Sequence, residues 1–398
     1  MSASAPAPPT RRRVHPALKL TLLLIGCVLA LLATEGAFRA FWTLPPWFAE
    51  FQQAGMYVAT ADGDVALLPG YRGELQVDRR TTVVINSLGM RGPELSPKRG
   101  DERRLLVLGD SLVWGYGVDA EETFPPLLQE RLRTAGLPYT VGNGGVPGYG
   151  SRHMAQHMAR LDQPFGADAF VVCGYLGNDP LDDALPQRTV FAGLSLQGPW
   201  ARLVQDSWRA RLMYRSRAWL WLESWLLTNR EQSSLVKQLR FSPEEAAMAA
   251  GFTQDKLYAG LFLDVVDAKT QWVPDVPPVV PRHLAMLKSS LQAMQRTAGR
   301  RPFWFVILPT SFQVIPAKWH EKLAGLRFEA KDFERGLAQQ RWFAVARELG
   351  IRALDATPIL AAEADPAGLF VSDGGHLNER GHRVIAAWLA TELADGLR

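Results

Sequence analysis

The sequence predicts an α/β fold in which a parallel sheet is covered by helices on both faces. From Arg103 onward, short continuous apolar runs alternate with amphipathic stretches of helical period. Strands that are buried on both faces read as continuous apolar runs, and helices between them carry the crossovers of a doubly wound parallel sheet. The chain of 398 residues is 47% hydrophobic, which is typical of a globular protein with one large domain or two.

Five apolar runs are expected as strands of this sheet and five amphipathic stretches as its helices. The expected strands are 105–108, 139–141, 169–174, 303–308 and 351–354, and the expected helices are 124–133, 151–161, 283–297, 333–349 and 383–393. The preceding segment, 43–100, is a mixed lead-in with a β-branched strand at 81–85. The alternation of apolar runs and amphipathic stretches is interrupted at about 181–280, and we interpret this segment as a mostly helical insertion into the domain 101–398.

The charge distribution argues against a nucleic-acid partner. The formal net charge of +4 is carried by the first 19 residues, and residues 20–398 balance at 40 basic and 40 acidic side chains. A broad nucleic-acid-binding face would need an excess of Lys and Arg within the domain. Only two cysteines are present, Cys27 and Cys173, which excludes a disulfide scaffold and a cysteine-rich zinc module.

The first 42 residues are typical of a segment that targets a protein to the membrane. Residues 1–16 form a basic tail, and an apolar segment at 17–42 follows, which we interpret as an uncleaved transmembrane signal anchor. Arginines on its N-terminal side place that end in the cytoplasm, so the rest of a single-pass inner-membrane protein would be extracytoplasmic. Two alternatives remain: a signal peptide cleaved near Thr34–Gly36, and a lipobox ending at Cys27, although the segment after Cys27 stays apolar.

Four short blocks at expected strand ends carry side chains suited to acyl transfer. Ser111 follows the first strand, where a parallel α/β sheet binds its ligands. A glycine-rich turn at 143–150 follows the second strand, and Gly177-Asn178-Asp179 follows the third. Asp373 and His376 precede the last helix, and their spacing lets a carboxylate meet the imidazole Nδ1 and leaves Nε2 free to face a nucleophile.

Together these blocks resemble the SGNH (GDSL) hydrolase superfamily over roughly 101–180 and 282–398. The resembling residues are Gly109–Leu112, Gly148, Gly177–Asp179 and Asp373–His376, and the lead-in Asn86–Gly92 is similar to that of many membrane-anchored bacterial members. The resemblance implies a flavodoxin-like fold with no cofactor and no metal. Residues 181–280 resemble nothing that would identify a substrate.

The resemblance also implies a role for each site residue. Ser111 would be the nucleophile, His376 the general base and then acid, and Asp373 the carboxylate that fixes the imidazole tautomer. The backbone N–H groups of Ser111 and Gly148 and the amide of Asn178 would form the oxyanion hole. Asp110 and Asp179 are expected to hold their loops as structural carboxylates. The Gly-x-Ser-x-Gly motif of α/β-hydrolases does not occur in the sequence.

The expected activity is hydrolysis of an acyl ester, with O-acetyl on a cell-envelope carbohydrate as the favoured substrate. One alternative is an O-acyltransferase that passes the acyl group to a polysaccharide, which would need a membrane partner to deliver the acyl donor. A lipase or lysophospholipase-type esterase is a second alternative, and a catalytically inactive glycan-binding module is a third. The complete set of site residues argues against the last of these.

Two further features invite a functional interpretation. His153 and His157 have metal-ligand spacing, but no Glu or Cys accompanies them, so we expect packing histidines. The insertion is rich in aromatic and basic side chains: Trp200, Trp208, Trp219, Trp221 and Trp225, with Arg202, Arg209, Arg211, Arg215, Arg217 and Arg230. A cap that packs on the catalytic domain is the favoured interpretation of this segment, and a helix at the membrane interface is the alternative.

Overall fold

The computed structural model describes residues 15–42, 55–184, 188–191, 193–197, 201, 208–228, 261, 263–269, 278–325, 330–372 and 374–398. The chain divides into two compact units. One comprises residues 1–45 and 207–240, and the other comprises residues 46–206 and 241–398.

The larger unit is built on a five-stranded sheet in which every strand pairs in parallel with its neighbours. Its strands are β5 (Arg103–Gly109), β6 (Tyr139–Gly145), β7 (Ala169–Tyr175), β10 (Phe303–Leu308) and β11 (Arg352–Asp355). They lie in the order β11-β10-β7-β5-β6. Counted along the chain from β5, this is the flavodoxin-like order 2-1-3-4-5, in which the direction of winding switches between the first and third strands. The predicted fold class is confirmed, and the switch lies between β5 and β7.

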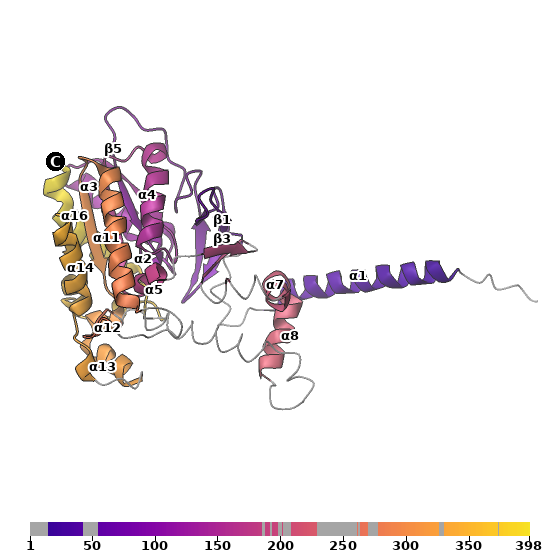
Figure 1. The fold of residues 1–398 in the computed structure, drawn as a ribbon. Helices are drawn as coiled ribbons and strands as arrows, with labels where there is room; N and C mark the ends of the chain where they lie inside the picture. The colour runs from indigo at the N-terminus through magenta and orange to yellow at the C-terminus, as the bar shows by residue number, and fades with distance from the viewer. Residues whose placement is uncertain are drawn as a thin grey trace, which may run out of the picture. The chain divides into compact units, whose positions relative to one another are not determined.

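Helices cover both faces of the sheet (Figure 1). One face carries α3 (Phe124–Thr134) and α16 (Glu379–Leu397), and the other carries α4 (Ser151–Phe165), α11 (Val279–Ala298) and α14 (Leu337–Glu348). All five predicted strands and all five predicted helices are present, with ends displaced by at most four residues.

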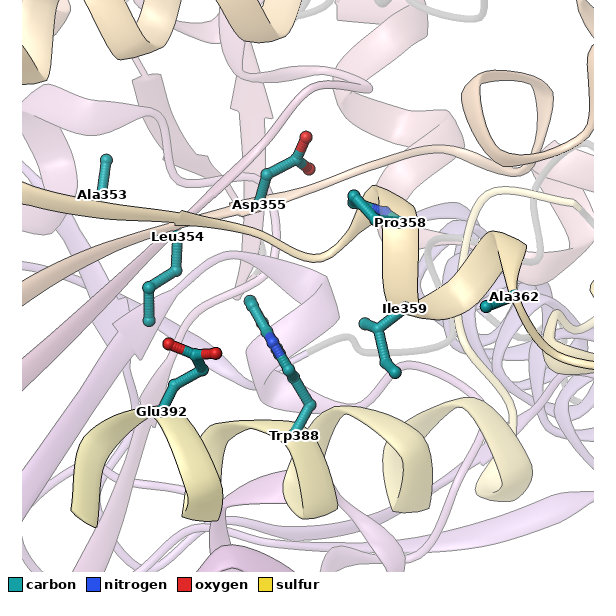
Figure 2. Close-up of a pocket in the computed structure, with 8 residues that line it drawn as sticks. All are labelled: Ala353, Leu354, Asp355, Pro358, Ile359, Ala362, Trp388 and Glu392. Atoms are coloured by element: carbon teal, nitrogen blue, oxygen red, sulfur yellow. The ribbon is translucent and has the colours of Figure 1, made fainter. Parts of the chain in front are cut away.

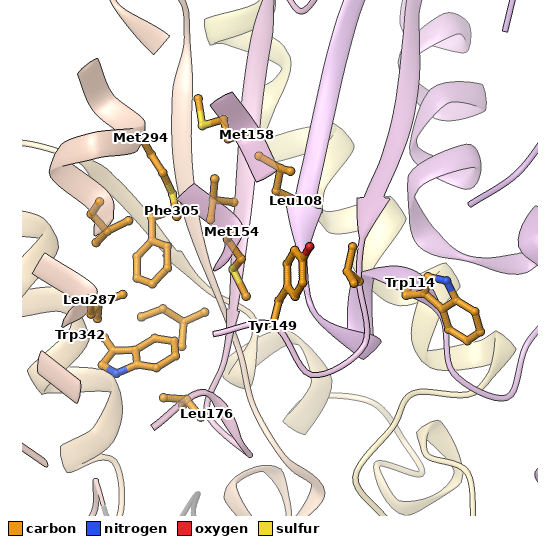
Figure 3. Close-up of a cluster of buried hydrophobic side chains, with 14 of the residues drawn as sticks. Leu108, Trp114, Tyr149, Met154, Met158, Leu176, Leu287, Met294, Phe305 and Trp342 are labelled. Carbon is orange, nitrogen blue, oxygen red and sulfur yellow. The ribbon is translucent and has the colours of Figure 1, made fainter. Parts of the chain in front are cut away.

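Side chains of β5 alternate between two buried cores. Leu105 and Val107 of β5 belong to the core beneath α3 and α16, and Leu106 and Leu108 belong to the core on the opposite face. Figure 3 shows Leu108 among buried side chains of this second core, which include Tyr149, Met154, Phe305 and Trp342. Because both faces are buried, β5 needs a continuous apolar run, which is the signal that predicted it.

The lead-in and the insertion each add antiparallel hairpins to the larger unit. They are β1 (Tyr57–Ala59) with β2 (Val65–Leu67), β3 (Arg72–Gln76) with β4 (Arg80–Val84), and β8 (Arg188–Phe191) with β9 (Leu194–Gln197). The predicted strand at 81–85 is β4. The hairpin β8–β9 lies in the insertion, where no strand was predicted, and Leu263 and Val265 from the same insertion are buried in the core that contains Leu108.

The smaller unit contains α1 (Pro16–Phe41) and two helices of the insertion, α7 (Trp208–Arg215) and α8 (Arg217–Thr228). Within the described residues, α1 is the one helix long and apolar enough to cross a membrane, and none of its residues is buried. A signal sequence near the N-terminus would have the same composition and length. Within this unit, α8 contacts α1 and α7. The cap predicted for the insertion stays a prediction, and Trp200 lies outside the described residues.

Candidate active site

Ser111 lies just beyond the carboxyl end of β5, at the switch point of the sheet. Asp110 follows the strand and caps the short helix α2 (Ser111–Trp114), because its Oδ1 accepts a hydrogen bond from the backbone N–H of Leu112 at 2.9 Å. Ser111 is therefore the first residue of a helix, with its hydroxyl 3.4 Å from the second oxygen of Asp110. The strand and the cap together fix the direction of this hydroxyl.

His376 is brought to Ser111 by the loop that precedes α16. Its Nε2 lies 2.8 Å from Ser111 Oγ, although 265 residues separate the two positions. The loop turns at Gly374, whose φ of +67° favours glycine, and ends at Asn378, whose side chain accepts from the first N–H groups of α16. The Tyr175 hydroxyl, at the end of β7, donates to the Gly375 carbonyl at 2.8 Å and ties this loop to the sheet. Asp373 lies outside the described residues.

The lead-in motif at 86–92 contacts the short helix that begins at Ser111. The guanidinium of Arg91 lies 4.1 Å from the Trp114 ring centroid, and its Nη1 donates to the Trp114 carbonyl at 2.7 Å. Its Nη2 donates to the Val118 carbonyl at 2.6 Å. A cation at the C-terminal end of a helix satisfies carbonyls that have no partner in the helix itself. Arg91 therefore connects the lead-in motif to the segment that follows Ser111.

The predicted glycine block forms a tight turn after β6. Gly148 has a φ of +75°, and a Cβ placed there would lie 2.8 Å from Nη2 of Arg188. The positive φ therefore favours glycine at this position, and the Arg188 guanidinium lies close to it. At the strand end, a Cβ on Gly145 would lie 2.3 Å from the backbone nitrogen of Trp114, so β6 and α2 also approach closely.

Asn178 follows β7 and directly precedes α5 (Asp179–Ala184), at the same edge of the sheet as Ser111. Its Nδ2 donates a hydrogen bond to Asp182 Oδ2, which fixes the orientation of the amide. Asp182 in turn lies 3.6 Å from Arg188, whose Nη1 donates to Ser195 Oγ at 3.0 Å within the hairpin β8–β9. The assignment of Ser111, Gly148 and Asn178 as oxyanion donors stays a prediction, and the structure places each of them beyond a strand end at the switch point.

Asp182 and Arg188 are site neighbours that the sequence analysis missed. Both side chains are almost completely buried, at 0% and 4% exposure. The sequence signal that could have identified Asp182 is the run of acidic residues after Asn178. In a segment without any resemblance, such a run is more typical of a solvated surface. A single arginine inside a segment without any resemblance carries no signal of its own.

Burial governs the ionisation of the two predicted structural carboxylates. Desolvation raises the pKa of Asp110 to about 6, and the nearby charge of Asp182 acts in the same direction. Desolvation, together with the charges of Asp110 and Asp183, raises the pKa of Asp179 well above its ordinary value. Asp179 Oδ2 accepts from the backbone N–H of Tyr175 at 2.9 Å, which holds the loop as expected for a structural carboxylate.

A second buried network supports the glycine and asparagine blocks. Asp183 Oδ2 accepts from the Ser151 hydroxyl at 2.7 Å and lies 2.9 Å from His283 Nδ1. His283 Nε2 accepts the indole N–H of Trp342 at 2.8 Å. This chain of contacts connects α5, α4, α11 and α14, so the helices of one face hold the loops that carry Gly148 and Asn178.

The remaining histidines and Cys173 have structural surroundings. His153 and His157 are buried and pack on the ring of Tyr149, and burial lowers the pKa of His157 to about 3. His382, the nearest alternative base in the sequence, is also buried and accepts from the backbone N–H of Phe124 at 3.2 Å, with its pKa lowered to about 3. Burial raises the pKa of the Cys173 thiol. Over the described part of the chain, no group of three or more His, Cys, Asp or Glu side chains could hold a metal ion.

A separate pocket of about 470 Å³ lies at the edge strand of the sheet (Figure 2). It is lined by β11, by α15 (Thr357–Ala361) with the residue that follows it, and by Trp388 and Glu392 of α16. None of the predicted site residues lines this pocket. Ser111 and His376 contact each other at a different place, so the candidate active site is the group of loops around these two residues.

Comparisons with known proteins find likeness at the level of structure. No protein-family model matches the chain, and no curated protein matches it either. Solved structures that resemble it include a lipase/acylhydrolase from Enterococcus faecalis, at 11% identity and a TM-score of 0.38, which covers 74% of this chain and 96% of that one. A psychrotrophic esterase from Pseudoalteromonas sp. matches at 10% identity and a TM-score of 0.35, over 73% of this chain and 97% of that one. A member of the lipolytic protein G-D-S-L family from Veillonella parvula matches at 12% identity and a TM-score of 0.35, over the same shares of the two chains. At these identities and TM-scores, the likeness assigns no activity to this chain.

Proposed function

We propose that this chain is a serine esterase of the SGNH type that hydrolyses an acyl ester. The observation that carries the proposal is the 2.8 Å contact between Ser111 Oγ and His376 Nε2 at the switch point of the sheet. A serine hydroxyl is a weak nucleophile until a base within hydrogen-bond reach takes its proton. His157 and His382 are buried with pKa values lowered to about 3, whereas His376 lies within hydrogen-bond distance of a serine hydroxyl.

In the proposed mechanism, Ser111 Oγ attacks the ester carbonyl carbon while His376 Nε2 accepts the hydroxyl proton. The carbonyl oxygen becomes an oxyanion, which the N–H groups of Ser111 and Gly148 and the Asn178 amide stabilise. Collapse of the tetrahedral intermediate breaks the bond to the alcohol, and His376 returns the proton to the departing oxygen. Water then attacks the acyl-serine with the same base, which releases the carboxylic acid and restores Ser111. Asp373 would hold the imidazole tautomer and stabilise the imidazolium.

We further propose that the substrate is an O-acyl group, preferably O-acetyl, on a carbohydrate of the cell envelope. The apolar helix α1 supports this location, because the arginine-rich N-terminus would keep its first end in the cytoplasm and leave the catalytic unit outside. The protein would then be a single-pass protein of the inner membrane. Its accessible substrates would be the glycans and lipids of the envelope.

The deciding experiment is covalent labelling combined with turnover. A fluorophosphonate probe should modify Ser111 and no other serine, as read by intact mass and peptide mapping. The full chain should release p-nitrophenol from acetate esters faster than from longer acyl esters, and a sugar acceptor should leave the hydrolysis unchanged. Labelling that persists in Ser111→Ala would overturn the mechanism. Acyl transfer to the added sugar would instead assign an O-acyltransferase that uses the same residues.

A further inference from the structure

The smaller unit collects the exposed apolar side chains of the described chain. All but two of the exposed large hydrophobic residues, Leu68 and Val266, lie on α1, α7 or α8. The tryptophans of the two units differ in the same way. Trp208, Trp221 and Trp225 are 65%, 39% and 45% exposed, whereas Trp114 and Trp342 of the catalytic core are completely buried. Large apolar surfaces of this kind mark a site of interaction.

The length of α1 places its last turns at the surface of a bilayer. With 26 residues at 1.5 Å per residue, the helix is about 39 Å long, against a hydrocarbon thickness of about 30 Å. If Pro16 lies at the inner boundary of the hydrocarbon, the roughly 20 residues that cross it end at about Glu35, and the segment from Glu35 to Phe41 lies among the headgroups. Glu35 and Arg39 in this segment are the first charged side chains after Lys19. They form an i,i+4 ion pair at 2.7 Å.

The helices α7 and α8 are attached to α1 at this same segment. Glu35 accepts hydrogen bonds from the Ser216 hydroxyl at 2.7 Å and from the backbone N–H groups of Arg217 and Ala218 at 2.9 and 3.1 Å. A carboxylate at these positions caps the N-terminus of α8 and is favoured by the helix dipole. Arg39 completes the junction, since its Nη2 donates to the Arg215 carbonyl at 2.9 Å.

Aromatic contacts extend the junction along α8. The ring of Phe38 on α1 lies 5.3 Å from that of Trp221, and Trp208 lies 5.6 Å from Trp219. Arg211 and Arg215 on α7 are also exposed. Tryptophan and arginine together are the composition of helices that lie in the headgroup region, where indole rings face the acyl boundary and guanidinium groups meet phosphate.

We propose that α7 and α8, which we call the interfacial helix pair, lie in the headgroup region of the bilayer that α1 spans, on the catalytic side of the membrane. The occupant of their exposed aromatic surface is the lipid itself, with phosphate groups as partners of the arginines. The inference rests on the membrane anchoring proposed above. It adds a second point of membrane attachment, because the chain leaves the catalytic unit at about residue 206 to form the pair and returns to it at about 241.

The test measures the depth of single spin labels on the full chain in vesicles of phosphatidylcholine and phosphatidylglycerol. Native Cys27 on α1 is exposed and Cys173 is buried, so a label on the unmodified chain reports the anchor. In a Cys27→Ser background, Trp208→Cys and Trp225→Cys report the interfacial helix pair. Val266→Cys is the matched control, because Val266 is an exposed apolar residue of the catalytic unit. Thermal melting followed by circular dichroism verifies that each variant is folded.

Relative accessibility to oxygen and to a water-soluble nickel chelate gives the depth of each label. The label on Cys27 should lie deep in hydrocarbon, those at 208 and 225 about 5–10 Å into the headgroup and acyl boundary, and the one at 266 in water. Labels at 208 and 225 that match the control at 266, while Cys27 remains deep, would overturn the interfacial placement and indicate that the helices cover protein. A label on Cys27 that is accessible only to the nickel chelate would overturn the anchoring itself.

A second variant tests the junction without altering an exposed aromatic residue. Glu35→Ala removes the acceptor for Ser216, Arg217 and Ala218, so trypsin should cleave after Arg215 and Arg217 faster than in the unmodified chain. Glu35→Gln keeps an acceptor oxygen and should give an intermediate rate. Equal cleavage rates in all three chains would show that Glu35 does not hold the interfacial helix pair.

Discussion

Replacing Asp110 by Asn should stabilise the fold at neutral pH and slow the reaction. The Asp110 side chain is completely buried, and its Oδ1 caps α2 through the N–H of Leu112. An asparagine keeps an acceptor oxygen for this cap and removes the buried negative charge. The charge of a protonated His376 lowers the pKa of Asp110, so the Asp110 carboxylate favours the imidazolium that forms during turnover. The Asn variant lacks this attraction, and its kcat should fall.

The magnitude follows from the pKa of Asp110. Burial raises this pKa from its ordinary value of 3.8 to about 6, a difference of about 2 units, or about 3 kcal/mol. Because the folded pKa lies above the unfolded one, the folded state retains the proton longer. Below about pH 4, Asp110 is protonated in both states and does not lower the free energy of unfolding. Between about pH 4 and 6 the free energy of unfolding falls, and above about pH 6 the whole decrease of about 3 kcal/mol is present. Asp110→Asn should match the parent at pH 4 and exceed it by about 3 kcal/mol at pH 8.

Thermal melting of the full chain in detergent at a series of pH values measures this difference. At about 2–4 °C per kcal/mol, the Tm of Asp110→Asn should exceed that of the parent by roughly 6–12 °C at pH 8. Asp110→Ala is the matched control, because it removes the same charge and also the cap, which costs about 1 kcal/mol. Its gain at pH 8 should be smaller. A change in Tm that is the same at pH 4 and at pH 8 would refute the argument from buried charge.

Three further predictions concern the other members of the site. Ser111→Ala and His376→Ala should each abolish esterase turnover, with the double variant no worse, since nucleophile and base act as one unit; near-normal rates for His376→Ala would exclude it as the base. Asn178→Ala should lower kcat by about 10²–10³-fold, with Asp373→Asn between this loss and that of Ser111→Ala; an Asn178→Ala variant that is folded and as inactive as Ser111→Ala would give the amide another role. Arg188→Ala should destabilise the catalytic unit by about 3–5 kcal/mol in chemical denaturation, because it leaves the buried Asp182 without its cation, and an unchanged denaturation midpoint would contradict this.

The sheet and the position of Ser111 at its edge could be predicted because their signals are local. Each strand of the parallel sheet is buried on both faces, so β5 and β10 carry continuous apolar runs that can be read without knowledge of their neighbours. The carboxyl ends of such strands meet at one edge, which makes the position after β5 a candidate site from the sequence alone. The 2.8 Å contact between Ser111 and His376 agrees with that reasoning.

The support of Ser111 by Arg91 could not be predicted in the same way. The motif at 86–92 was noted for its resemblance, but its contact with α2 depends on a turn in which Asn86 Oδ1 accepts from the N–H of Met90 at 3.0 Å. That turn directs Arg91 toward the carbonyls of Trp114 and Val118. The turn directly precedes Arg91, but its targets lie more than 20 residues further along the chain, and hydrophobic periodicity contains no information about a contact of this kind.

The insertion poses the larger problem, because its two parts have different physical roles. The Trp- and Arg-rich helices α7 and α8 pack with α1, whereas the hairpin β8–β9 returns Arg188 to the catalytic loops. The Trp- and Arg-rich composition singled out the segment of α7 and α8 in the sequence. Composition could not single out the hairpin β8–β9, because one arginine in a short hairpin resembles any solvated charge. The effect of that arginine depends on burial, which only the folded chain defines.

The buried carboxylates around Asn178 explain why an arginine is needed there. Asp110, Asp179 and Asp182 are buried at one edge of the sheet, and their mutual repulsion contributes to the raised pKa values of Asp110 and Asp179. Arg188 lies 3.6 Å from Asp182 with its side chain 4% exposed, so it compensates charge where water cannot. The same guanidinium lies near the Gly148 turn, since a Cβ placed on Gly148 would be 2.8 Å from its Nη2. One side chain from the insertion thus compensates the carboxylate that orients Asn178, and we infer that the hairpin β8–β9 helps to keep Asn178, one of the predicted oxyanion donors, in place.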